Sequence, residues 1–306
     1  RGHRSARRGR RPVSGDRLDV ALLAAGLARS RTHARRIVEE GRARIDGRRA
    51  DKPSAPVPDG ARLTVVDVPD GIEYASRAAH KLAGALDLLE LDPRGLLCLD
   101  AGASTGGFTD VLLRRGADRV IAVDIGHDQL ADHVREDARV EVRDGTSVRD
   151  LTPGMLGARV DLVVADLSFI SLRTVLPALA GVIAPHGELL LMVKPQFEVG
   201  RQALPRTGVV TDPAARIRAV EGVVETAAEQ GLELAAIGPS ALPGQDGNRE
   251  YFVHLRPSRS IRPHAAGATA PGSSCTPDAQ AYDMIGSAVG GALPRRRRDQ
   301  NAPEED

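Results

Sequence analysis

Two lysines and two acidic residues have the types and positions that proton transfer requires. Only three of the 42 basic residues are lysines, namely Lys52, Lys81 and Lys194. Arginine keeps its proton in a protein, whereas a buried lysine can lose it and act as a general base. Lys194 follows the apolar run 188–193, so its amine is placed at the end of a predicted buried strand, where α/β folds have their active sites. The alternatives are chance and a solvated surface charge.

Lys81, Asp166 and Glu250 accompany Lys194 at comparable positions. Asp166 and Glu250 flank the predicted strands 160–166 and 251–255, and Lys81 lies on a helix that leads into the first strand. A general base needs neighbours that orient it and balance charge. Separate surface salt bridges are the alternative, but four such residues in one fold favour a shared site.

A glycine-rich loop follows the first predicted strand of the same unit. It reads D-A-G-A-S-T-G-G-F-T-D over residues 100–110 and opens a predicted helix. Gly102 permits a tight turn, and Gly106 and Gly107 permit a ligand to approach the backbone closely. Dinucleotide-binding proteins also have such a loop, but the spacing here differs from G-x-G-x-x-G. Asp124 ends the next predicted strand and adds a carboxylate.

Alternating strands and helices over residues 76–256 must position these side chains. Helices are predicted at 107–115, 172–183 and 213–230. Strands are predicted at 96–100, 120–124, 140–143, 160–166, 188–194, 232–237 and 251–255. The alternation predicts an α/β fold with a mostly parallel, Rossmann-like sheet and helices on both faces.

A smaller basic α+β unit is predicted at residues 16–68, followed by a linker at 69–75. Asp16 can cap one helix, and Ser30 can cap a second helix that Gly41 ends. The D-G pair at 46–47 accepts the positive φ of a tight hairpin, and 63–66 is predicted to be another strand. A small basic protein-interaction module is one interpretation of this unit.

The composition sets further bounds. Cys98 and Cys275 have no disulfide or metal-ligand spacing, which is typical of a reducing cytoplasm, and Cys98 is expected to be buried. No segment approaches ~18 consecutive apolar residues, and the N-terminus lacks the pattern of a signal peptide. We therefore predict a cytoplasmic protein without a membrane span. Residues 1–15, with six arginines, are predicted to form a disordered basic arm or a nucleic-acid contact, and 257–306 a disordered tail.

The N-terminal unit resembles the RNA-binding domain of the ribosomal protein S4 family. The pattern L-D-x-x-L-x-x-x-G-L-A-x-S-R, followed by G-x-x-R-I-D-G, carries this resemblance. It implies RNA binding through an arginine-lined face, mainly to phosphates and to RNA shape. The residues expected to take part are Arg17, Arg29, Arg31, Arg35, Arg36 and Arg44.

The larger unit resembles S-adenosylmethionine methyltransferases that act on RNA ribose 2′-oxygens. The loop is similar to their D-x-G-x-x-x-G-G-F pattern, and the four charged residues are similar to their K-D-K-E tetrad. The span 16–256 as a whole resembles the TlyA family, which joins an S4-type domain to an FtsJ-like methyltransferase domain. The fragments S-R-A-A-H-K-L, D-L-S-F-I-S-L, V-K-P-Q-F-E-V-G and G-N-R-E-Y-F carry it. Members are called hemolysins or 16S/23S rRNA (cytidine-2′-O)-methyltransferases.

The resemblance implies S-adenosyl-L-methionine as cofactor, rRNA or ribosomal subunits as partner, and no metal. Asp144 would approach the adenine, or is a plain strand-end turn residue. The segments I-G-H-D at 125–128 and R-D-G-T at 143–146 depart from the family pattern. The contacts with the adenine are therefore expected to differ from those of the family. The loop 196–210 closes over RNA or is a connection. The implied cofactor-binding residues are Asp100, Gly102, Ala103, Ser104, Gly106, Gly107, Phe108, Asp124, Asp144 and Asp166.

The implied reaction is direct methyl transfer to a ribose 2′-oxygen. Lys194 would accept the hydroxyl proton, since burial and the nearby positive charges favour its neutral amine. Asp166 would orient Lys194 and the methyl donor, and Glu250 with Lys81 would hold the ribose. A membrane-active hemolysin remains open, although no amphipathic membrane helix is evident. A non-catalytic ribosome-assembly factor also remains open, and the complete tetrad argues against it.

Overall fold

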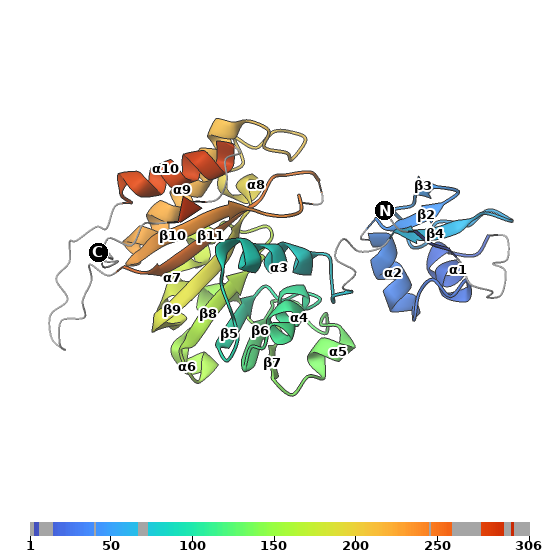
Figure 1. Ribbon diagram of the computed structural model, residues 1–306, viewed down its shortest axis with the longest axis horizontal. Helices are drawn as coiled ribbons and strands as arrows, with labels where there is room; N and C mark the ends of the chain where they lie inside the picture. Colours follow the sequence, from blue (N-terminus) through green and yellow to red (C-terminus); the bar gives the residue numbers. More distant parts are fainter. Residues whose placement is uncertain are drawn as a thin grey trace, which may run out of the picture. The chain divides into compact units, whose positions relative to one another are not determined.

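The computed structural model describes residues 3–5, 15–39, 41–66, 73–244, 246–258, 277–290 and 295–296. The chain divides into two units, Arg1–Arg77 and Ala78–Asp306, which Figure 1 colours from blue to red along the sequence. The division falls next to the predicted linker 69–75.

The N-terminal unit packs two helices against an antiparallel sheet. The helices are α1 (Leu18–Ala24) and α2 (Arg31–Glu39). The sheet has the order β1-β4-β2-β3, with bounds β1 His3–Ser5, β2 Ala43–Ile45, β3 Arg48–Arg49 and β4 Leu63–Val66. Leu18, Leu22, Ile37, Val38 and Val65 belong to the core between them. This is the small α+β unit that the sequence predicted.

The local signals in this unit are mostly confirmed. Ser30 Oγ accepts a hydrogen bond from the His33 backbone N–H at 3.0 Å, and Gly41, just beyond α2, has a φ of +67°. The hairpin turn has positive φ at Asp46 and Gly47, of 49° and 79°, as a D-G turn requires. The predicted cap Asp16 is wrong, because α1 has Arg17 at its N-cap position and no side-chain cap.

The predicted disordered arm is also wrong in part. Within residues 1–15, strand β1 pairs antiparallel with β4, His3 opposite Val66. A sheet edge offers unpaired backbone donors and acceptors to any extended segment. Pairing with a distant strand cannot be predicted from composition. The prediction of disorder was based on the arginine content of the arm alone.

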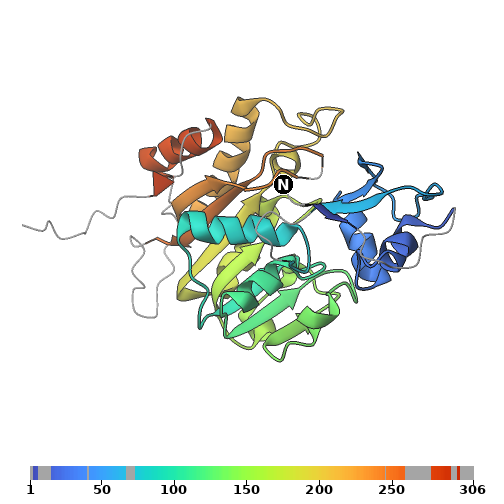
Figure 2. The same cartoon turned by 45° about the vertical axis from the view of Figure 1, so that its right-hand side comes forward.

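The larger unit is built on a mixed sheet (Figure 2). Its strand order is β12-β10-β11-β9-β8-β5-β6-β7. Strands β7, β6, β5, β8 and β9 are parallel, and β11, β10 and β12 continue antiparallel. The bounds are β5 Leu97–Ala101, β6 Arg119–Val123, β7 Val140–Arg143, β8 Val160–Ala165, β9 Ile183–Val193, β10 Leu232–Pro239, β11 Tyr251–Pro257 and β12 Arg295–Arg296. All seven predicted strands are present.

Helices flank both faces of this sheet, because successive strand residues point to opposite sides. On one side Leu99, Val163 and Leu191 belong to the same core as Val175 and Val223. On the other side the Phe108 and Phe252 rings lie 6.2 Å apart. The helices are α3 Ala78–Leu89, α4 Gly107–Arg114, α5 Asp132–Arg135, the 3₁₀ helix η1 Val148–Asp150, α6 Pro153–Leu156, α7 Leu172–Val182, α8 Pro195–Glu198, α9 Pro213–Glu229 and α10 Ala279–Gly290.

Helix α10 lies inside the predicted disordered tail 257–306, so that prediction is wrong for this segment. Met284 and Ile285 are buried in the core of the larger unit, and Asp278 Oδ1 accepts the Ala281 N–H at 3.0 Å at the start of the helix. The apolar side chains recur three and four residues apart, as on one face of a helix. The surrounding Ala, Gly and Ser content concealed this pattern.

Among the residues that the structure describes, no helix is long and apolar enough to cross a membrane.

Candidate active site

The sheet topology brings the four charged tetrad residues to one edge. Asp166 directly follows β8 and Lys194 directly follows β9, and these strands are parallel. Glu250 directly precedes β11, which runs antiparallel to β9 with Tyr251 opposite Val193. Lys194 and Glu250 therefore occupy the next position of the register. Lys81 approaches from the first half of α3.

These residues form two lysine–carboxylate pairs. Lys194 Nζ lies 2.6 Å from Asp166 Oδ1 and donates to Ser168 Oγ at 2.9 Å. Lys81 Nζ lies 2.5 Å from Glu250 Oε2. The side chains of both lysines are 10% exposed, and that of Glu250 is 2% exposed. Charges this buried persist only as pairs, because an unpaired charge would carry its desolvation cost alone.

Glu198 holds the segment after Lys194 in place. Its carboxylate accepts hydrogen bonds from Ser171 Oγ at 2.5 Å and from the Leu172 N–H at 2.7 Å. These donors stand at the N-terminus of α7, where the helix dipole favours an anion. Burial raises the pKa of Glu198. The contact ties the Asp166 loop to the Lys194 loop.

Asn248 holds the loop before β11 in place through hydrogen bonds to the backbone. Its Oδ1 accepts the Val210 N–H and its Nδ2 donates to Gly208 O, both at 2.9 Å. The end of the 196–210 loop is therefore attached to the G-N-R-E segment that carries Glu250. A Cβ on Gly244 would lie 2.7 Å from Glu250 Oε1, so a side chain at this position would displace the Glu250 carboxylate.

Phe169 lies near the candidate site, and the sequence reasoning did not select it. It is 92% exposed, and its φ of +64° is unusual and costly for a bulky residue. Its ring lies 5.4 Å from that of Phe197, and Lys194 Nζ lies 5.9 Å from the Phe197 centroid. Phe169 belongs to the D-L-S-F-I-S fragment, so its motif was visible although its exposure was not.

The glycine-rich loop begins at a deeply buried acid. Asp100 is fully buried and accepts a hydrogen bond from Thr109 Oγ1 at 2.6 Å. Its other oxygen, Oδ1, has no hydrogen-bond partner among the described residues. Burial raises the pKa of Asp100 to about 7. A buried oxygen without a partner is the feature expected beside a polar ligand.

At two positions of the loop, glycine is favoured by a positive φ and by close packing against a leucine side chain. Gly102 and Gly106 have φ values of +89° and +87°. A Cβ on Gly102 would lie 2.7 Å from Leu167 Cδ2, and one on Gly106 would lie 2.9 Å from Leu130 Cδ2. Gly107 opens α4, and Ala103 and Phe108 are buried. The loop is thus held in one conformation at the end of β5.

The carboxylates of Asp124 and Asp144 both accept hydrogen bonds from backbone N–H groups of the surrounding loops. Asp124 Oδ2 accepts the Ser104 N–H at 2.8 Å, and its Oδ1 accepts the Gly126 N–H at 2.7 Å. Each carboxylate oxygen keeps a further lone pair for a ligand hydroxyl. Asp144 Oδ2 accepts the Asp128 N–H at 3.0 Å and pairs with Arg135 at 2.9 Å. The Asp128 hydrogen bond is the main cause that lowers the pKa of Asp144. The turn role of Asp144 is present, and its adenine contact stays a prediction.

The predicted RNA-binding arginines have different surroundings. Arg17 and Arg31 both contact the buried carboxylate of Asp19, at 3.1 and 3.4 Å, and the hydrogen bond from Arg17 is the main cause that lowers the pKa of Asp19. Arg44 donates to the backbone oxygens of Gly41 and Ala43. Arg35 is exposed. Arg29 and Arg36 turn toward Glu73 instead.

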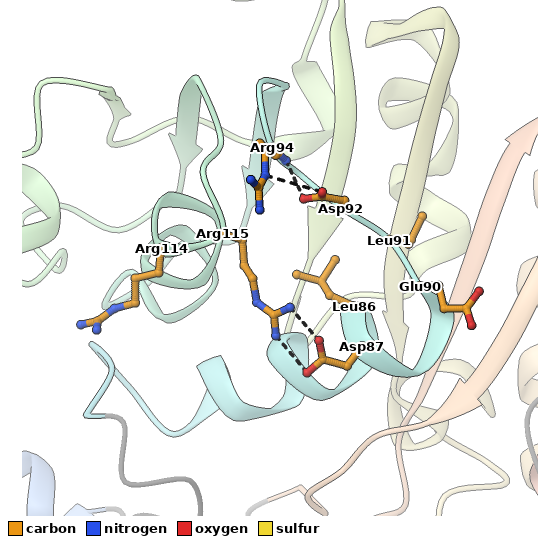
Figure 3. Close-up of a pocket in the computed structure, with 8 residues that line it drawn as sticks. All are labelled: Leu86, Asp87, Glu90, Leu91, Asp92, Arg94, Arg114 and Arg115. Atoms are coloured by element: carbon orange, nitrogen blue, oxygen red, sulfur yellow. Dashed lines mark hydrogen bonds and ion pairs between the residues drawn. The ribbon is translucent and has the colours of Figure 1, made fainter.

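A surface cavity of about 380 Å³ lies elsewhere on the larger unit (Figure 3). It is lined by the C-terminal ends of α3 and α4, where Arg115 makes a two-fold contact with Asp87 at 2.6 and 2.9 Å. Lys81 and Gly107 lie toward the opposite ends of these helices. The cavity is therefore not part of the site.

Within the described part of the chain, no group of His, Cys, Asp and Glu side chains could hold a metal ion.

The strand order and the paired lysines and carboxylates at its edge define an α/β methyltransferase fold with a small RNA-binding-type domain ahead of it. The FtsJ-like methyltransferase family matches residues 74–257, and the S4 domain matches residues 16–63. The chain is 51% identical over 240 residues, 78% of its length and 89% of the relative, to the 16S/23S rRNA (cytidine-2′-O)-methyltransferase TlyA of Mycobacterium tuberculosis. It belongs to the TlyA family of FtsJ-like methyltransferases.

Two further similarities agree with this. Hemolysin A of Brachyspira hyodysenteriae is 31% identical over 78% of this chain and 99% of that protein. The solved structure of a candidate hemolysin from Streptococcus thermophilus is 32% identical, with a TM-score of 0.68 over 91% of this chain and 96% of that chain. Proteins with either name are thus similar to most of this chain.

Proposed function

We propose that this chain transfers a methyl group from S-adenosyl-L-methionine to the ribose 2′-oxygen of cytidine in 16S or 23S rRNA. The observation that carries the proposal is the pair of buried lysine–carboxylate contacts at one edge of the sheet. The S4 domain at residues 16–63 and the rRNA-methyltransferase relative of 51% identity support RNA as the substrate.

Lys194 is proposed to accept the proton of the 2′-hydroxyl. A ribose hydroxyl is a very weak acid, so its oxygen becomes a useful nucleophile only as the proton leaves. Lys194 is placed by Asp166 and by Ser168, and the Phe197 ring covers it. When bound, S-adenosyl-L-methionine supplies an electrophilic methyl group on a sulfonium. Lys81 and Glu250 would orient the ribose and keep the local charge balanced.

The cofactor is proposed to lie over the loop at the ends of β5 and β6. The unpartnered Asp100 oxygen and the free lone pairs of Asp124 fit a ligand that carries an ammonium group and ribose hydroxyls. Asp144 would stand on the adenine side, with its position fixed by Arg135. Holding donor and acceptor together supplies much of the rate acceleration.

The RNA is proposed to contact the exposed arginines and the aromatic pair. Arginines such as Arg35 suit phosphates, and the exposed Phe169 ring suits stacking with an unpaired base. Phe169 lies beside Phe197, which in turn contacts Lys194. A base stacked there would bring its own ribose close to the proposed proton acceptor.

The test is methylation by the purified protein. Ribosomal subunits that lack the modification are incubated with the protein and methyl-labelled S-adenosyl-L-methionine, and the RNA is digested to nucleosides. Label in 2′-O-methylcytidine supports the proposal. Label in a base-methylated nucleoside, or none in RNA while the protein binds the cofactor, contradicts it.

A further inference from the structure

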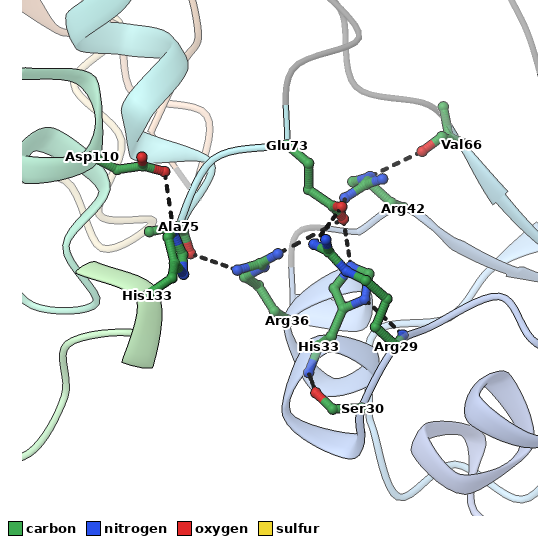
Figure 4. A network of polar contacts seen from close by, with 10 residues as sticks. All are labelled: Arg29, Ser30, His33, Arg36, Arg42, Val66, Glu73, Ala75, Asp110 and His133. Atoms are coloured by element: carbon green, nitrogen blue, oxygen red, sulfur yellow. Dashed lines mark hydrogen bonds and ion pairs between the residues drawn. The ribbon is translucent and has the colours of Figure 1, made fainter. Parts of the chain in front are cut away.

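The carboxylate of Glu73 in the N-terminal unit contacts the side chains of three arginines and one histidine (Figure 4). Glu73 Oε2 lies 2.7 Å from Arg29 Nη2, and Glu73 Oε1 contacts His33 Nε2 at 2.5 Å. Arg36 Nη2 and Arg42 Nη1 follow at 3.7 and 4.0 Å from Oε1. Three arginines thus surround a single negative charge, so the cluster keeps a local excess of positive charge.

Contacts other than those with Glu73 help to position His33, Arg36 and Arg42. His33 and Arg36 lie on one face of α2, because residues three apart share a helix face, and Arg29 precedes the helix. Arg42 follows Gly41 and donates from Nε to Val66 O at 2.9 Å, which fixes the direction of its guanidinium. Such a preformed set of donors is an anion site in its own right.

The contacts of His33 identify its protonation form. The Arg29 backbone N–H donates to His33 Nδ1 at 3.0 Å, so Nδ1 is an acceptor and Nε2 carries the proton that points at Glu73. Burial is the main cause that lowers the pKa of His33. Burial acts to raise the pKa of Glu73, but its contacts with His33 and Arg29 outweigh this effect, so the pKa is lowered. These contacts therefore favour the ionised form of the Glu73 carboxylate.

The site is open to solvent on one side. The Arg29 side chain is 74% exposed and that of Glu73 is 31% exposed, whereas His33, Arg36 and Arg42 are 11, 21 and 17% exposed. A phosphodiester carries the same single charge as a carboxylate and also offers two oxygens to arginine forks. It can approach from the open side, but only where Glu73 withdraws.

We propose that Arg29, His33, Arg36 and Arg42 form a binding site for an RNA backbone phosphate, and that Glu73 occupies this site as an internal anion which the phosphate displaces. The inference rests on the proposed function, because it takes RNA as the substrate. It adds His33 and Arg42 to the RNA contact. It also makes Glu73, which directly precedes the methyltransferase match at 74–257, a competitor of RNA.

The experiment compares full-length variants in binding to purified ribosomal subunits at about 0.1 M salt. Glu73→Gln removes the charge and keeps the size, so it should bind three- to ten-fold tighter than wild type. Asp51→Asn is the matched control, since Asp51 pairs with Arg49 in the same unit, and it should stay within about two-fold of wild type. An affinity of Glu73→Gln no higher than that of Asp51→Asn overturns the inference.

Arg42→Gln gives an independent readout through a double-mutant cycle. In wild type this change weakens the contact of Arg42 with Glu73 as well as its contact with the phosphate, so its two effects on RNA affinity partly cancel. In the Glu73→Gln background only the phosphate contact is lost, so affinity should fall several-fold more. Equal losses in the two backgrounds would contradict displacement.

Two controls keep the result interpretable. If Glu73→Gln unfolds, as circular dichroism would show, Glu73→Asp carries the test, because its shorter carboxylate should give a smaller gain in affinity and no gain would refute the inference. Methylation is measured on the same wild-type preparation. Wild type that binds and methylates subunits while Glu73→Gln binds no tighter refutes only this inference. Wild type that does neither refutes the proposed function.

Discussion

Replacing Lys194 by arginine separates proton transfer from charge pairing. Lys194 lies 2.6 Å from Asp166 and is 10% exposed, so its charge contributes to the site whether or not it acts as a base. Arginine keeps that charge and reaches the same carboxylate, but it cannot release a proton. Lys194→Arg should therefore fold and bind cofactor and ribosomal subunits nearly as wild type does.

The expected loss lies in the chemical step. A positioned general base contributes about 10²- to 10⁴-fold in rate, or about 3–5 kcal/mol of activation free energy. Lys194→Arg should lose this whole amount, nearly as much as Lys194→Ala. The alanine variant should in addition lose about 1–3 kcal/mol of stability, because the Asp166 carboxylate keeps its burial and loses its partner.

The assay is single-turnover methyl transfer to subunits with saturating enzyme and labelled S-adenosyl-L-methionine, beside thermal unfolding of the same samples. Lys81→Arg is the matched control: Lys81 is equally buried but is assigned to charge balance, so its arginine variant should keep partial activity. Methyl transfer by Lys194→Arg within ten-fold of wild type would refute the assignment of Lys194 as proton acceptor.

Three further changes test other parts of the account. Gly106→Val should weaken cofactor binding at least ten-fold by calorimetry, because its side chain would displace Leu130 and strain the backbone; unchanged affinity would remove this loop from the cofactor site. Arg31→Ala with Arg35→Ala should weaken subunit binding and flatten its salt dependence, since fewer counterions are released, while cofactor affinity stays constant; an unchanged salt slope would argue against this face. Burial raises the pKa of Asp100 from 3.8 to about 7, so the folded form binds a proton that the unfolded form has lost and stability falls as the pH rises through this range. Asp100→Asn should remove that loss, so its melting temperature relative to wild type should increase from pH 4 to pH 8; a constant difference would show that Asp100 is not the titrating group.

Periodicity predicted the strands of the larger domain well because they are mostly apolar and several are separated by long helices. Each of the strands from β5 to β11 falls on a segment that the sequence marked. Among the elements that were missed, β1, α10 and β12 are held by partners distant in sequence. Strand β12 pairs with β10 across more than fifty residues of chain, and no local pattern records such a partner.

The sequence indicated which charged residues lie together at the candidate site, but it did not indicate how they pair. The motifs indicated Lys81, Asp166, Lys194 and Glu250, but the division into two pairs depends on the antiparallel register between β9 and β11 and on the place of α3. The same limit applies to the arginine face. The helical pattern indicated exposed arginines, whereas the carboxylate of Glu73, 44 residues from Arg29 in the chain, decides where two of them point.

The most direct test of the central claim maps ribose methylation in rRNA from cells with and without this gene. The account predicts that at least one 2′-O-methylcytidine is lost without the gene, that the wild-type gene restores it, and that the Lys194→Arg gene does not. Identical ribose methylation in both strains, or full restoration by Lys194→Arg, would contradict the account.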